Sequence, residues 1–209
     1  MPNWCTNNLL ITGRKKELDR LMEYVKGEDN AFTFNSILPM PEDLRGTTSP
    51  SRIISQEEYD NIPADEKAKM DDPNNPFVSR PLTQAMSDKY LSLYGNDNWY
   101  DWSNDNWGTK WDTSDVEMRR YSDTELAYEF DTAWCPPEGV FGELVNQFPK
   151  LEFSLEWHEE GGEAGILYGD EPLPERESSR AMNARIEAMV QAMSTKNKTM
   201  VWTTGREMS

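Results

Sequence analysis

The sequence is poor in the side chains that most often carry catalysis and metal binding. Its 209 residues include two cysteines, Cys5 and Cys135, and a single histidine, His158. Two cysteines cannot build a disulfide framework or an all-cysteine zinc site, which excludes those two classes of fold. Any Ser-His-Asp or Cys-His arrangement would have to use His158, which ends a predicted strand and precedes Glu159 and Glu160. With no Walker-type loop and no dinucleotide glycine fingerprint either, we predict no cofactor, no metal and no catalytic residues.

Long apolar runs are also missing. No stretch approaches the roughly 20 apolar residues that a membrane-spanning helix needs. The first residues have neither the basic region nor the apolar region of a signal peptide. Together with the free cysteines, these absences predict a cytoplasmic protein without a membrane partner.

Positive charge is scarce. The chain has 21 Lys and Arg against 38 Asp and Glu, a formal net charge of −17. Such a field repels phosphate backbones and anionic lipids, so we predict no direct binding to nucleic acid or membranes. Two interpretations remain open. The charge keeps the protein in solution, or it attracts a partner protein with a basic surface, as an imitation of nucleic acid would.

Aromatic residues are abundant, and the apolar residues follow regular patterns. Eight Trp, eight Tyr and seven Phe compensate for an apolar share of 36%. Leu18, Leu21, Met22 and Val25 have helical spacing, and another helix is expected after Pro136-Pro137. Alternation predicts strands over Cys5–Thr12, Ala31–Leu38, Val116–Tyr121, Glu125–Trp134, 151–158 and Ala164–Tyr168. This order predicts an α+β, ferredoxin-like domain with a mostly antiparallel sheet and helices on one face.

Two parts of the chain depart from this pattern. Residues 42–95 are polar and rich in proline, and predict an insertion with two helices and a loop around 71–80. Ser55 and Glu58 have the spacing of a capping box at the start of the first helix. The domain is thus expected to span 1–170. Residues 171–209 predict a linker, an amphipathic helix from Met182 to Met193 and a polar tail, the helix docking on its own domain or on a partner.

The segment 94–112 holds four of the eight tryptophans, interleaved with Asn and Asp. Since Asn and Asp favour turns, we predict an irregular stretch. In one interpretation its rings plug one end of the sheet. In the other they form a recognition surface for a peptide, sugar or base. The candidate binding residues are Trp99, Asp101, Trp102, Asp105, Trp107, Lys110, Trp111 and Asp112.

Two enzyme-like versions of this segment are weaker. A calcium loop starting at Asp101 would have Asn106 where Gly is required and Asp112 where Glu is usual. Paired carboxylates among Asp97, Asp101, Asp105 and Asp131 could act on a sugar stacked on tryptophan. Acids are so frequent in this chain that such pairs arise by coincidence.

A second candidate surface is the acidic hairpin near residue 160. It carries Glu152, Glu156, Glu159, Glu160 and Glu163. The charges would prevent edge-to-edge pairing of strands, and they are also where a basic partner would first make contact. We therefore add Glu156, Glu159 and Glu160 to the candidate binding residues.

Several strings resemble a known family. Met1-Pro2-Asn3-Trp4-Cys5-Thr6-Asn7-Asn8, Ile37-Leu38-Pro39-Met40-Pro41, Asn106-Trp107-Gly108-Thr109-Lys110-Trp111-Asp112 and Phe130-Asp131-Thr132-Ala133-Trp134 are similar to the YubB-like family. The resemblance covers roughly residues 1–170. It implies a ferredoxin-like domain and a phage or plasmid origin, hence a bacterial host cell, and it implies no activity or catalytic residue.

The preferred hypothesis from the sequence is a non-enzymatic, acidic protein-binding module of a phage or plasmid. Its partner would be a host protein with a basic surface, and its effect the inhibition of a host defence or nucleic-acid-handling protein. The alternative is a small-ligand or carbohydrate-binding protein, or an enzyme, that uses the segment 94–112.

Overall fold

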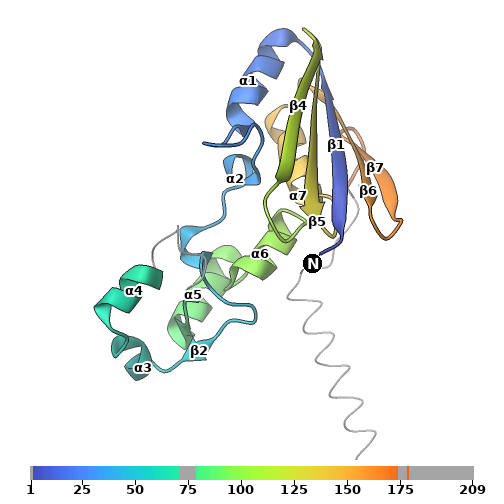
Figure 1. The fold of residues 1–209 in the computed structure, drawn as a ribbon. Coiled ribbons are helices and arrows are strands. Elements are labelled where there is room, and N and C mark those ends of the chain that lie inside the picture. Colours follow the sequence, from blue (N-terminus) through green and yellow to red (C-terminus); the bar gives the residue numbers. More distant parts are fainter. Residues whose placement is uncertain (1, 71–78, 174–177, 179–209) are drawn as a thin grey trace, which may run out of the picture. The chain divides into compact units, whose positions relative to one another are not determined.

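The computed structural model describes residues 2–70, 79–173 and 178 (Figure 1). The chain divides into two compact units, Met1–Pro174 and Glu175–Ser209. The predicted helix from Met182 to Met193 and the polar tail lie outside the described residues, and so does most of the predicted loop at 71–80.

A five-stranded antiparallel sheet forms the centre of the first unit. Its strands stand in the order β4-β5-β1-β6-β7, so β1 lies between β5 and β6 (Figure 1). The strands are β1 (Trp4–Thr12), β4 (Ser114–Ser122), β5 (Glu125–Ala133), β6 (Glu152–Glu159) and β7 (Ala164–Tyr168). Alternation predicted all five to within two residues at each end.

Two helices, α1 (Lys15–Val25) and α7 (Glu138–Gln147), cover one face of this sheet (Figure 1). Their buried residues meet the inward side chains of the strands, such as Leu9 and Phe153. The chain order is β-α-β-β-α-β followed by β7, and β1 and β5 are neighbours at the centre. The α+β, ferredoxin-like prediction is confirmed.

Strict alternation separates the two faces of the sheet. In β1, Leu9 and Ile11 are buried, whereas Thr6 and Asn8 are exposed on the other face. In β6, Leu155 is buried and its neighbours Ser154 and Glu156 point the other way. One face thus belongs to the core, and the opposite face carries polar side chains.

The predicted strand Ala31–Leu38 is wrong. Phe34 to Ile37 form a short helix, α2 (Phe34–Ile37), which begins at the cap residue Thr33. The Thr33 hydroxyl accepts from the amide of Asn35, and the Asp112 carboxylate accepts from the amide of Phe34 at 2.7 Å. Sequence alternation placed Phe32 and Phe34 on one side, but the two caps satisfy the backbone as a helix instead.

The insertion is more structured than predicted. It contains a 3-10 turn, η1 (Glu42–Leu44), and three helices, where two were expected. These are α3 (Gln56–Asp60), α4 (Ala64–Met70) and α5 (Gln84–Tyr94). Two short strands, β2 (Ile53–Ile54) and β3 (Leu82–Thr83), pair in parallel. The capping box of Ser55 and Glu58 is confirmed, and its hydrogen bonds lower the pKa of Glu58.

Candidate protein-binding face

The segment 94–112 is irregular only in part, since its middle is helical, which corrects the prediction there. Residues 99–106 form a helix, α6 (Trp99–Asn106). Asn98 caps it by accepting from the amide of Asp101 at 2.9 Å. The residue type that suggested turns therefore acts here as a helix start, which is the other position that Asn favours.

Two of the candidate tryptophans belong to the hydrophobic core. Trp102 and Trp107 are almost fully buried and pack edge to face, with ring centroids 5.6 Å apart. The indole N–H of Trp107 donates to the carbonyl of Leu38 at 2.8 Å. Neither ring offers a free face to a ligand.

The acids of this segment accept hydrogen bonds from their own chain. Asp97 accepts from the hydroxyls of Ser51 and Ser87, both at 2.5 Å. Asp101 accepts from the side-chain amide of Asn98 at 2.8 Å, and Asp105 from that of Asn96 at 2.9 Å. Asp112 caps α2. Within the described ranges, no three His, Cys, Asp or Glu side chains come together as metal ligands.

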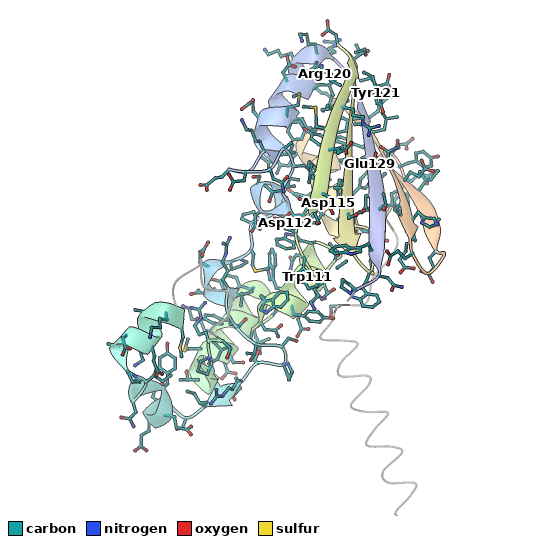
Figure 2. All side chains as sticks on the ribbon, viewed as in Figure 1. Trp111, Asp112, Asp115, Arg120, Tyr121 and Glu129 are labelled. Carbon is teal, nitrogen blue, oxygen red and sulfur yellow. The ribbon has the colours of Figure 1, made fainter. Side chains whose placement is uncertain are left out.

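The remaining candidates form a small aromatic cluster. The Lys110 ammonium lies 4.4 Å from the ring centre of Trp111, 5.6 Å from that of Tyr100 and 6.0 Å from that of Trp99. Trp111 also faces Trp4, at 6.3 Å between ring centres. The cluster lies at one end of the sheet, opposite the end that carries Arg120 and Tyr121 (Figure 2). These rings already hold a cation from their own chain.

The acids that share a surface lie on the sheet face opposite α1 and α7. Cross-strand pairing places them in two columns, one on each side of the uncharged strand β1. We call this surface the acidic face. It comprises Glu125, Glu129 and Asp131 of β5 and Glu152 and Glu156 of β6.

The strand register fixes the spacing of these columns. Asn8 pairs with Glu129 on one side and with Glu156 on the other, and Thr12 pairs with Glu125 and Glu152 in the same way. Because neighbouring strands lie about 4.8 Å apart, the two columns are about 10 Å apart at the backbone. Along each column, residues two apart are about 7 Å apart.

Two of these carboxylates bond to β1, which orients them. The Thr6 hydroxyl donates to Asp131 at 2.9 Å, and the Thr12 hydroxyl donates to Glu152 at 3.1 Å. Glu129 and Glu156 are exposed, and Glu129 lies 3.9 Å from Arg119. Figure 2 shows Glu129 on the sheet, away from Trp111. A shallow hollow of about 540 Å³ extends from the columns across β6 to β7, and it is lined by Thr6, Asn8, Glu129, Glu156, Trp157, His158, Ala164, Gly165 and Ile166.

The three glutamates predicted from the hairpin have different positions. Glu156 belongs to the acidic face. Glu160 is exposed at the end of β6 and accepts from the amide of Trp4 at 3.1 Å. Glu159 is buried on the opposite side, and its carboxylate accepts from the amide of Gly161 at 2.6 Å. Glu159 therefore stabilises the hairpin turn, and its burial removes it from the surface that a partner could reach.

The sequence-based candidate binding residues did not include Glu125, Glu129, Asp131 or Glu152, although Glu152 was named in the acidic hairpin and Asp131 among the paired carboxylates. A signal was present, because Glu129 and Asp131 alternate with Tyr128 and Phe130. The ferredoxin-like strand order would then have placed the acids of β5 and β6 on either side of β1. Alternation alone identifies the polar face of each strand and leaves open which strands are neighbours.

The environment of Cys5 disfavours a role as a nucleophile. Cys5 is fully buried on β1, and burial raises the pKa of its thiol to about 11. The thiol is therefore protonated near neutral pH, and the thiolate is the reactive form. The raised pKa contributes stability below pH 9.0, the ordinary value, which is lost as the pH rises through about 11.

Comparison with known proteins agrees with the architecture. Residues 106–196 match the family model described as "Ferredoxin-like domain in Api92-like protein". The match supports the fold and names no activity. The resemblance to the YubB-like family, with its phage or plasmid origin, stays a prediction.

Two further comparisons do not indicate what the protein does. The crystal structure of a protein api92 from Yersinia pseudotuberculosis is similar, with 16% sequence identity and a TM-score of 0.45. The similarity covers 85% of this chain and 100% of that one. A search of the curated proteins finds no match. Among the helices described, none is long and apolar enough to cross a membrane.

Proposed function

We propose that this chain is a non-enzymatic protein-binding module that binds a basic segment of a partner protein on its acidic face. One observation carries the proposal. Two columns of carboxylates flank an uncharged central strand on the face that α1 and α7 leave open. A surface of this kind favours a cationic partner and raises its rate of association.

The shape of the acidic face suits a polypeptide. The columns are about 10 Å apart, and an α-helix with its side chains is about 10–12 Å across. An extended chain fits the same space, with Lys or Arg side chains reaching both columns. The neutral residues Asn8, Leu10 and Thr12 of β1 form the floor between them.

A finer form of the proposal concerns the kind of partner. Surfaces that bind nucleic acid are basic, because they neutralise phosphates. An acidic face that covers such a surface would inhibit a nucleic-acid-handling or defence protein of a bacterial host. The alternative site in segment 94–112 has less support, because its acids accept hydrogen bonds from the chain itself and two of its four indoles are in the core.

Charge reversal at the centre of the acidic face tests the proposal. The probe is a short labelled peptide in which lysine and valine alternate, at low ionic strength. The double variant Glu129→Lys/Glu156→Lys is expected to weaken binding at least about tenfold, since it replaces attraction by repulsion in both columns. Fluorescence anisotropy measures the dissociation constant.

The matched control is Glu57→Lys/Glu66→Lys, in α3 and α4. It makes the same change in net charge at exposed glutamates outside the sheet. The control is expected to change binding less than about threefold, through the long-range field alone. Equal losses in the two double variants would contradict a localised site. The finer form of the proposal predicts that a partner protein bound to this chain no longer binds duplex DNA. A partner that binds this chain and duplex DNA at the same time would refute it.

A further inference from the structure

We infer that the free edge of β7 pairs with an extended segment of the basic partner, which adds a sixth strand to the sheet. This inference rests on the proposed function for the charge of the partner. It goes further in assigning the backbone groups that bind and the conformation that the partner adopts. A strand paired with β7 lies about 10 Å from β6 and about 19 Å from β5, so it is a second contact that reaches the column on β6 and not the one on β5.

The two edges of the sheet differ in a way that favours β7. The edge strand β4 has register irregularities between Ser114 and Glu117 and between Arg120 and Ser122. It also carries charged side chains, and both devices prevent pairing with another strand. The edge strand β7 has the sequence Ala-Gly-Ile-Leu-Tyr, with no charge and no proline, and its register with β6 is regular.

The backbone groups at the free edge can be assigned. The amide of Gly169 donates to Phe153, and the amide of Glu159 donates to the carbonyl of Glu163. In an antiparallel pair, hydrogen-bonded and non-bonded residue pairs alternate. Gly165 and Leu167 therefore bond to β6. By the same alternation, the N–H groups of the three other residues of β7 point away from the sheet, and these are Ala164, Ile166 and Tyr168.

The chain that follows β7 turns away from this edge. The amide of Glu171 donates to the carbonyl of Tyr168 at 3.3 Å. Leu173 packs against the core and occupies the space above Gly142 of α7. Up to residue 173, the described chain therefore continues toward the helix layer and leaves the edge of β7 open.

Side chains around the edge select a basic strand. From Leu151 to Pro174 the sequence has seven Asp and Glu and no Lys or Arg. A second copy would bring the same seven acids, so repulsion disfavours pairing of two β7 strands. Ile166 and Tyr168 are 49% and 44% exposed on the acidic face. A partner Arg or Lys can lay its stem on Ile166 and reach Glu156, which pairs with Ile166, while the ring of Tyr168 attracts its charge.

The variant Ile166→Pro tests this inference. Proline removes one outward N–H without removing a hydrogen bond to β6. Binding of the lysine–valine peptide is expected to weaken at least about tenfold, as one backbone hydrogen bond is lost and a clash is added. The matched control Ile166→Val keeps the N–H and the β-branched side chain, and is expected to bind as the unmodified chain does.

A second probe keeps the inference testable if Ile166→Pro fails to fold. The same peptide, N-methylated at alternate residues so that one edge cannot bond, should lose binding to the unmodified chain. Unchanged binding of that probe, or of folded Ile166→Pro, would overturn the inference and leave the acidic face intact as a site. If Glu129→Lys/Glu156→Lys loses binding while folded Ile166→Pro keeps it, the acidic face is supported as a site and the pairing with β7 is overturned.

Two other occupants are outcomes of the same experiments. If sedimentation velocity shows that the unmodified chain is a dimer and that Ile166→Pro is a monomer, β7 pairs with a second copy of the chain. Slow hydrogen exchange at Ala164, Ile166 and Tyr168 before any peptide is added would mean that the chain covers its own edge. Either result would overturn the inference. Fast exchange that slows on addition of the peptide supports it.

Discussion

Replacing Phe34 with alanine is expected to lower the free energy of unfolding by about 3–5 kcal/mol. Phe34 is fully buried, and its ring packs edge to face against Phe32, Trp107 and Phe130, with ring centres 5.8–6.0 Å apart. The substitution removes the ring and leaves a cavity between α2, the sheet and the residue that follows α6. Such aromatic pairs also contribute beyond their buried area.

Urea unfolding followed by tryptophan fluorescence measures this loss. Leu93→Ala is the control, because Leu93 is 60% exposed on α5 and its loss should cost less than about 0.5 kcal/mol. Similar free energies for the two variants would contradict the packing described for Phe34. The result bears on function only indirectly, since Phe34 lies on the core side and the acidic face on the other.

Replacing Asp112 with alanine is expected to cost about 2–3 kcal/mol. Its carboxylate accepts from the hydroxyl of Thr33 at 2.6 Å, from the amide of Phe34 at 2.7 Å and from the side-chain amide of Asn35 at 2.9 Å. It also accepts from the amide of Thr113 at 2.8 Å. Alanine leaves these donors without their acceptor and removes a negative charge from the start of α2.

The same variant separates a structural role of Asp112 from a binding role. Asp112→Asn keeps the shape and part of the accepting capacity, so we expect an intermediate loss of about 1 kcal/mol. Asp29→Ala, at an exposed loop position, is the control and should cost less than about 0.5 kcal/mol. Binding of the lysine–valine peptide should not change. Weaker peptide binding at unchanged stability would indicate that Asp112 takes part in peptide binding.

The elements that the sequence predicts well are those with long, simple periodicity. β6 alternates from Glu152 to His158, and β7 and the hairpin of β4 and β5 follow from the same pattern. The elements that it mispredicts are short and depend on distant partners. α2 needs the carboxylate of Asp112, which lies far along the chain, and no local pattern contains that contact.

The proposed binding face shows the same division. Of the three glutamates named from the charge of the hairpin, Glu156 lies on the acidic face, Glu160 is exposed outside it, and Glu159 is buried. Its burial follows from alternation, since it follows His158 on the side of Leu155. The partner column on β5 could not be found from the hairpin alone. It appears only when the strand order brings β5 and β6 to either side of β1.

The most direct test of the acidic face is to map where a basic peptide binds. Amide chemical shifts of the full chain, labelled with nitrogen-15, are followed by NMR while the lysine–valine peptide is added. The account predicts that the largest changes fall on β1, β5, β6 and β7, around Asn8, Glu129 and Glu156. Changes concentrated in residues 94–112, or on α1 and α7, would contradict it.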